Sequence, residues 1–175
     1  FKKGSMPLTV DNIASGVRIL LNEGGQNVEI DTGSGIVNKN IEEILSNHRR
    51  DPLRFPAEQS SADIRGIVMH AIKEGIKSTG LALEAFETPD KTFYLRHKEF
   101  GEDHTFSVTT NLPGLLTRQA NIAELAEPGI DVAGRIGGQA ARGKGQYLTA
   151  IHGGSPAKGI TIQYDRTIGL KEVPI

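Results

Sequence analysis

The chain contains no cysteine and no tryptophan, and these two absences exclude several kinds of protein. Without cysteine it has no disulfide, no thiolate nucleophile and no cysteine-ligated metal. Only 5% of its residues are aromatic, which leaves little material for a surface that stacks sugar rings. No apolar run approaches the ~20 residues that span a bilayer, and nothing resembles a signal peptide. We therefore expect no membrane partner.

A surplus of charge of one sign is also missing. The 20 lysines and arginines are interleaved with 21 aspartates and glutamates, which gives a formal net charge of −1. Nucleic-acid binding needs concentrated positive charge to displace counterions, so we expect no nucleic-acid partner. A length of 175 residues suits one large or two small domains with a proper core.

The two ends of the chain look unlike a natural start and stop. The opening letters FKKGSM resemble expression-vector sequence, so we assign residues 1–6 to a tag. The closing letters GLKEVPI carry no terminal helix signal. We interpret the chain as a fragment of a longer protein, and we expect the fragment alone to be monomeric.

Residues 7–57 predict an N-terminal hairpin-plus-helix region. Two apolar runs flank Gly24 and Gly25, which is typical of a β-hairpin. Asn40 comes directly before Ile41, and Glu43 follows three residues after Asn40, so we expect a short helix capped at Asn40. The run RRDPLRFPAEQ contains two prolines and predicts a loop.

Residues 58–118 predict a helix packed on a small antiparallel sheet. The run SSADIRGIVMHAIKEGI has one apolar helical stripe, with Ser60 and Asp63 as its cap and an end near Gly75 and Gly80. The members of the stripe are Ile64, Ile67, Val68, Ala71 and Ile72. Three strand-like runs follow, GLALEAFE, KTFYLRHKEF and HTFSVTT, and Pro89-Asp90 marks the turn between the first two. We expect the helical stripe to pack on the sheet formed by residues 80–109.

Residues 129–168 predict a glycine-rich β unit with strand runs at DVAGRI, QYLT and GITIQYD. The fold class is therefore α+β. We expect mostly antiparallel strands, one or two short helices packed on small sheets, and glycine-rich β-turns in the C-terminal part.

The spacing from Gly138 to Gly143 and Lys144 fits the first part of a phosphate-binding P-loop, Gly-x-x-x-x-Gly-Lys. That loop needs Ser or Thr after the lysine as a Mg²⁺ ligand, and then a helix whose N-terminal amides face the phosphates. Here Gly145 occupies the hydroxyl position, and the β-prone run QYLT follows. We interpret the glycines as tight turns between strands, and a nucleotide-binding enzyme is the weaker alternative.

Histidine and serine patterns also give no catalytic or metal site. His97 and His104 lie near Glu99, Glu102 and Asp103, but structural zinc usually has four ligands in a compact pattern, often including cysteine. A solvated charged turn is the interpretation that we prefer. We expect His70 to lie on the surface, His48 to end a helix, and His152 to lie in a glycine loop. The run TGSGI lacks the spacing of a nucleophile elbow. We therefore assign no catalytic, cofactor-binding or metal residue and expect no enzyme activity.

The run GIDVAGRIGGQAARGKGQYLT, followed by AKGITIQYD, resembles the flagellin IN motif of bacterial flagellar axial proteins. The matching residues are Gly129, Asp131, Val132, Ala133, Gly134, Ile136, Gly138, Ala141, Gly143, Gly145, Gln146, Leu148, Thr149 and Gly159. Upstream, a looser resemblance covers the helix with Ile-Val-Met-His-Ala-Ile, the Thr-Gly-Leu strand and the Phe-Gly turn before Phe-Ser-Val. Arg135 and Arg142 replace small or hydroxylated residues of the motif, and Ala150 replaces a frequent glycine. We expect these changes to affect only the exposed surface.

The resemblance implies a structural, surface-exposed domain of a flagellar filament subunit or a filament cap protein. It implies an extracellular location on the flagellum, contacts with other subunits through segments outside this fragment, and a role in flagellar architecture and motility. It also implies export in an unfolded state, which fits the absence of cysteine. An adhesin-type binding module is the alternative, because exposed loops on a β scaffold often carry recognition.

Overall fold

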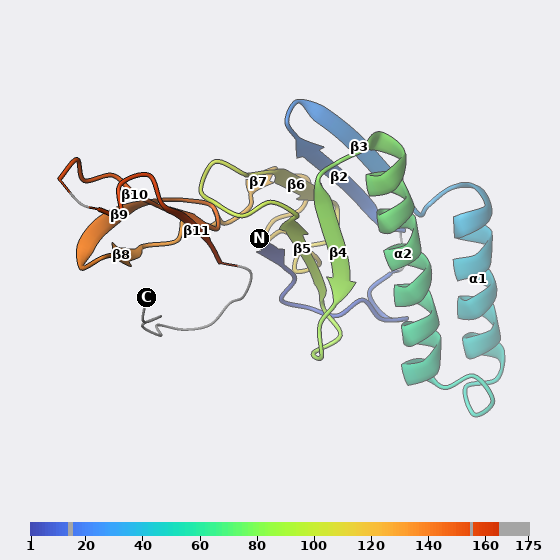
Figure 1. The fold of residues 1–175 in the computed structure, drawn as a ribbon. Coiled ribbons are helices and arrows are strands. Elements are labelled where there is room, and N and C mark those ends of the chain that lie inside the picture. The colour runs from blue at the N-terminus through green and yellow to red at the C-terminus, as the bar shows by residue number, and fades with distance from the viewer. Residues whose placement is uncertain (14–15, 155, 165–175) are drawn as a thin grey trace. The chain divides into compact units, whose positions relative to one another are not determined.

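A computed structural model describes residues 1–13, 16–154 and 156–164 (Figure 1). These residues contain two helices and eleven strands, and the strands form three antiparallel sheets. The expectation of a mostly-β α+β fold with antiparallel strands is thereby confirmed. The described residues divide into two compact units, the first within residues 1–98 and 105–127 and the second within residues 99–104 and 128–164. Of the expected glycine-rich unit, residues 155 and 165–168 lie outside the described residues.

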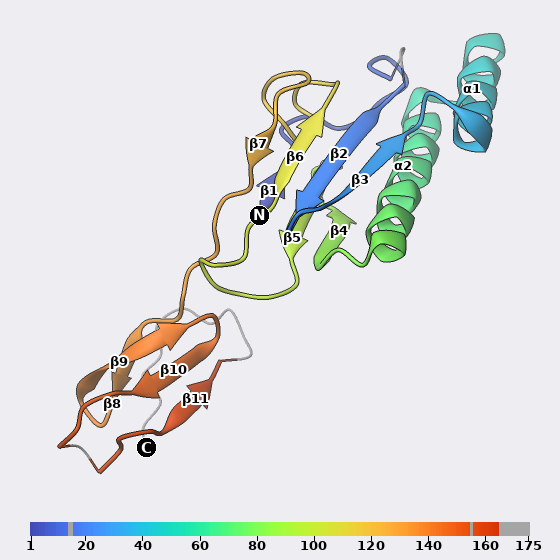
Figure 2. The same ribbon diagram turned by 90° about the horizontal axis from the view of Figure 1, so that it is seen from above.

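Two sheets belong to the first unit. One has the strand order β1-β5-β4, and the other has the order β3-β2-β6-β7 (Figure 2). Their bounds are β1 Lys2–Lys3, β2 Arg18–Glu23, β3 Gln26–Asp31, β4 Leu83–Glu87, β5 Phe93–His97, β6 Ser107–Thr110 and β7 Glu124–Leu125. The hairpin expected around Gly24 and Gly25 is present as β2 and β3, and both glycines have positive φ. The β4–β5 hairpin is also present, and across its turn the backbone N–H of Thr88 donates a hydrogen bond to the carbonyl oxygen of Thr92.

The third strand expected beside this hairpin belongs to the other sheet. β6 pairs with β2, with Ile19 opposite Thr110 and Leu21 opposite Val108. The expectation of one sheet over residues 80–109 was therefore wrong. The hairpin of region 7–57 and the strands of region 58–118 are joined by this pairing in a single compact unit.

Both helices begin earlier than expected. α1 spans Gly35–Arg50 with Ser34 at its N-cap, so Asn40 lies inside the helix and is not its cap. α2 spans Ala57–Thr79 with Pro56 at its N-cap, so the cap expected at Ser60 was also wrong. Asp63 instead accepts a hydrogen bond from Gln59. The end expected at Gly80 is confirmed, because this residue adopts the left-handed conformation that ends many helices.

The expected stripe on α2 faces the core of the first unit. Ile64, Val68 and Ile72 are fully buried, whereas Ile67 and Ala71 are partly buried at the margin of the stripe. Met69 and Ile76, which the stripe did not include, are buried as well. The buried side chains of β2, β4, β5 and β6 complete this core. α1 lies beside α2 and contributes Ile41 and Leu45 (Figure 1). In the described residues, no helix is long and apolar enough to span a membrane.

Residues 1–6, which we expected to be a tag, are part of this unit. β1 pairs with β5, with Lys2 opposite Leu95. The Lys2 ammonium group donates a hydrogen bond to the Glu124 carboxylate, which also accepts one from the backbone N–H of Arg118. The side chain of Glu124 is only 11% exposed. The hydrogen bond from Lys2 is the main reason that the pKa of Glu124 falls to about 2, against the opposing effect of burial.

We expect Glu124→Gln to lower the free energy of unfolding at pH 7 by about 2 kcal/mol, because a charged hydrogen bond is lost in a poorly hydrated place. The carboxylate of the folded chain titrates below its ordinary value of 4.5. Its contribution is therefore complete above that value and is lost as the pH falls toward 2. Urea unfolding at several pH values should show the two proteins converging over this range.

The matched control is Glu29→Gln, which removes a carboxylate from an exposed ion pair with Arg18. Exposed pairs contribute about 0–1 kcal/mol, so this variant should unfold almost like the parent. Equal unfolding of the Glu124 variant and the parent at pH 7 would contradict the assigned role of Lys2 and Glu124.

Candidate functional site: the glycine-rich β unit

The second unit is built around one four-stranded antiparallel sheet of order β11-β10-β9-β8. Its strands are β8 Gly134–Ile136, β9 Gln139–Lys144, β10 Tyr147–Ala150 and β11 Thr161–Gln163. The three expected strand runs are all represented: β8 and β11 are shorter than expected, and β10 is shifted by one residue. β9 was missed, since the sequence GQAARGK was interpreted as a turn. A small core forms on one face, where Ile136, Leu148 and Ala150 are buried.

Two tight turns join these strands. Gly137 and Gly138 both have positive φ, at 61° and 78°, between β8 and β9. A two-residue hairpin with both residues in this region is the type I′ turn that suits twisted strands. Gly145, with φ 57°, opens the two-residue turn between β9 and β10. The interpretation of these glycines as turn residues is confirmed.

Other glycines are required because the backbone of the unit approaches them closely. A Cβ atom on Gly143 would lie 1.6 Å from the carbonyl oxygen of Val132. A Cβ atom on Gly129 would lie 2.5 Å from the carbonyl oxygen of Gly101, and one on Gly134 would lie 2.9 Å from Leu148 Cδ2. Cβ atoms essentially never come closer than 3.0 Å to another heavy atom. At Gly143 and Gly129 the obstacle is backbone, so any side chain there would force the unit to rearrange, whereas the obstacle at Gly134 is the end of a flexible side chain that can shift.

Asp131 connects three segments of the unit. Its Oδ1 atom accepts hydrogen bonds from the backbone N–H of Gly145 at 2.8 Å and of Glu102 at 3.2 Å. The backbone N–H of Val132 donates to the carbonyl oxygen of Gly145 at 2.9 Å. The carboxylate thus holds the turn after β9 and the loop 99–104 together. The sequence pointed to Asp131 only as a matched motif residue, because the role depends on a loop 29 residues away.

The departures from the motif fall into two classes. Arg135 and Arg142 are exposed on the sheet, as expected. Ala150 is only 6% exposed and belongs to the small core, so the expectation that this change affects only the surface was wrong. An alanine methyl group there adds to the apolar packing against Leu148 and Ile136.

The P-loop comparison can be tested against the local backbone. β10 follows the Gly145–Gln146 turn, where a phosphate-binding loop would require a helix. Lys144 projects into solvent with its side chain 81% exposed, and its Nζ lies 3.8 Å from the Asp103 carboxylate. The local structure therefore lacks the converging amides and the lysine orientation that hold phosphates.

We expect Lys144→Ala and Arg142→Ala each to change the free energy of unfolding by less than about 0.5 kcal/mol, because both side chains are exposed. Chemical denaturation of each single variant measures this. A loss of more than about 1 kcal/mol in either variant would show that these cations have a structural role that their exposure does not reveal.

Two of the histidines have a carboxylate neighbour within their own unit. His97 Nε2 lies 3.3 Å from Glu23 Oε1, and its side chain is only 8% exposed. That burial differs from the solvated turn that we expected for it. In the loop 99–104, His104 Nδ1 lies 3.2 Å from Glu99 Oε2.

The remaining histidines occupy simpler positions. His70 and His152 are exposed, the former as expected and the latter in its glycine loop. His48 lies in the last turn of α1, as expected, and its Nδ1 atom is 2.7 Å from the carbonyl oxygen of Phe55.

The glycine-rich unit therefore offers turns, close backbone packing and one organising carboxylate, which are features of architecture. Comparison of the chain with protein-family models, curated proteins and solved structures gave no match.

Proposed function

We propose that this chain is a structural domain of an extracellular bacterial flagellar protein, either a filament subunit or a filament cap protein. The observation that carries the proposal is the agreement between the IN-motif resemblance and the backbone requirements of the second unit. Gly129 and Gly143 match the motif, and backbone atoms of the unit lie where a Cβ atom would be placed. Gly138 and Gly145 match it and have positive φ.

Three further matches support the same proposal. Asp131 is the acceptor that joins the turn to the loop 99–104. Ile136 and Leu148 form the small core. Matched residues that serve backbone geometry or packing in this way suit a protein that is selected for its shape. The two arginines that depart from the motif lie on the surface, where packing does not constrain them.

Immunogold electron microscopy of the bacterium that produces the parent protein would test this proposal. Antibodies raised against this chain should label flagella and should lose their target when the parent gene is deleted. Label along the filament would identify a filament subunit, whereas label confined to the filament tip would identify a cap protein.

Two outcomes would overturn the proposal. Label spread over the cell envelope, with flagella unlabelled, would favour the adhesin alternative. A deletion strain that assembles normal filaments and swims like the parent would exclude a necessary role in flagellar architecture.

A further inference from the structure

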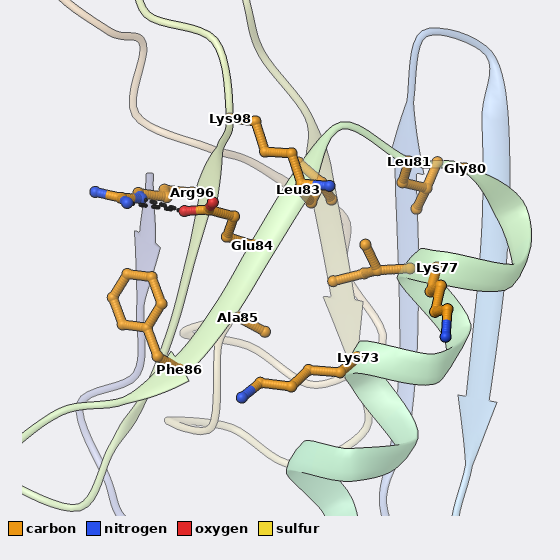
Figure 3. Close-up of a pocket in the computed structure, with 11 residues that line it drawn as sticks. Lys73, Lys77, Gly80, Leu81, Leu83, Glu84, Ala85, Phe86, Arg96 and Lys98 are labelled. Carbon is orange, nitrogen blue, oxygen red and sulfur yellow. Dashed lines mark hydrogen bonds and ion pairs between the residues drawn. The ribbon is translucent and has the colours of Figure 1, made fainter. Parts of the chain in front are cut away.

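A cleft of about 610 Å³ lies in the first unit between the C-terminal half of α2 and the β4–β5 hairpin (Figure 3). Lys73 and Lys77 project from α2 on one side, and Glu84, Arg96 and Lys98 line the hairpin side (Figure 3). Four cations and one carboxylate thus line one cleft, in a chain whose formal net charge is −1. Positive charge is therefore concentrated here although the protein as a whole has none in excess.

Three of these cations are available to a ligand. The Arg96 guanidinium is occupied, since it pairs with Glu84 at 2.8 Å and lies 5.3 Å from the centre of the Phe86 ring. Lys73, Lys77 and Lys98 make no ion pair within the described part of the chain, and all three are exposed. Lys73 and Lys77 are four residues apart on a helix, which places their Cα atoms about 6 Å apart along its axis.

The floor of the cleft is apolar. Ile76, Leu81, Leu83 and Ala85 line it, and each is less than 10% exposed. An apolar floor beneath a cationic rim is complementary to an aliphatic side chain flanked by carboxylates. Phe86 offers little to a sugar ring, because Arg96 lies over it and Tyr94 stacks on it at 4.8 Å. The aromatic platform that glycan recognition needs is thus already occupied.

We propose that this cleft binds an acidic peptide segment of a partner protein, with one aliphatic side chain on the floor and neighbouring carboxylates at Lys73, Lys77 and Lys98. A second copy meeting cleft to cleft is disfavoured, because the same lysines would face one another. The inference rests on the first unit alone and does not depend on the flagellar proposal.

The test uses the whole chain and a fluorescein-labelled probe, the synthetic peptide Asp-Glu-Leu-Glu-Asp. Fluorescence anisotropy at low salt should show saturable binding that weakens as salt rises, because exposed ion pairs are screened. Replacing the central leucine by serine keeps the peptide charge and should weaken binding several-fold, because the aliphatic contact is lost. The double variant Lys73→Gln/Lys77→Gln should bind the leucine peptide about tenfold more weakly, since two rim charges are removed.

The matched protein control is Lys39→Gln/Lys158→Gln, which removes the same charge from exposed positions outside the cleft. It should bind the leucine peptide like the parent, and the melting temperatures of both double variants should stay close to that of the parent.

Each of four results would overturn the proposal. They are no binding up to about 1 mM peptide, equal weakening in the two double variants, equal affinity for the leucine and serine peptides, and stronger competition by heparin than by unlabelled peptide of equal charge. The last two would identify general attraction of polyanions. Lysine-dependent self-association in sedimentation, without peptide binding, would identify a second copy as the occupant.

Discussion

Ile72→Asp should lower the free energy of unfolding of the first unit by about 4 kcal/mol or more. Ile72 is fully buried on the core-facing stripe of α2. An aspartate there would bury a carboxylate without a partner, and the loss of the isoleucine side chain would remove apolar contacts. The variant should be partly unfolded at 37 °C, as circular dichroism and hydrogen exchange of α2 would show.

The neighbouring residue provides the control. Lys73 is exposed in the same turn, so Lys73→Asp introduces the same carboxylate without burying it and should be nearly neutral. If the Ile72 and Lys73 variants have the same melting temperature, α2 does not pack on the core through this stripe.

Gly143→Ala should destabilise the second unit by about 2–4 kcal/mol, because the added methyl group would meet a backbone carbonyl that no side-chain rotation can move. The Cβ atom would lie 1.6 Å from the oxygen of Val132. To accommodate it, β9 must separate from the segment that carries Asp131. Hydrogen exchange measured peptide by peptide should show faster exchange in residues 128–164, while α2 keeps the protection of the parent.

A graded series of glycine variants separates crowding from conformational preference. Gly138 has φ 78° and open space around its missing side chain, so Gly138→Ala should cost about 1 kcal/mol. Gly153 has open space and no positive φ, so Gly153→Ala should be nearly neutral. If residues 128–164 are equally protected from hydrogen exchange in the Gly143 and Gly153 variants, the close packing at Gly143 is refuted.

The local features of the fold could be predicted from the sequence because they depend on neighbouring residues. Glycine pairs at 24–25 and 137–138 predicted hairpin turns, and the spacing of Ile64, Val68 and Ile72 predicted the buried face of α2. The helix starts were missed because several residues could serve as caps. Ser34 and Asn40 are both good N-caps, and the choice between them depends on packing that the sequence does not show.

The remaining features depend on pairing between distant segments. β6 joins β2 across more than 80 residues of chain, and no local pattern identifies that partner. β9 has few β-branched or aromatic residues and is a strand because β8 and β10 pair with it on both sides. The cleft could not be predicted from the sequence for the same reason, since Lys73 and Lys98 come from separate elements.

The position of the loop 99–104 affects the order in which the two units can fold during synthesis. It lies between two strands of the first unit, β5 and β6, yet it belongs to the second. During synthesis from the N-terminus, the loop emerges before its hydrogen-bond partner Asp131 exists. The first unit also cannot finish folding until residues 105–127 have been synthesised. Neither unit is formed by one continuous segment of the chain. A gene fusion that transferred only residues 128–164 would therefore leave the Asp131 carboxylate without its contact to Glu102.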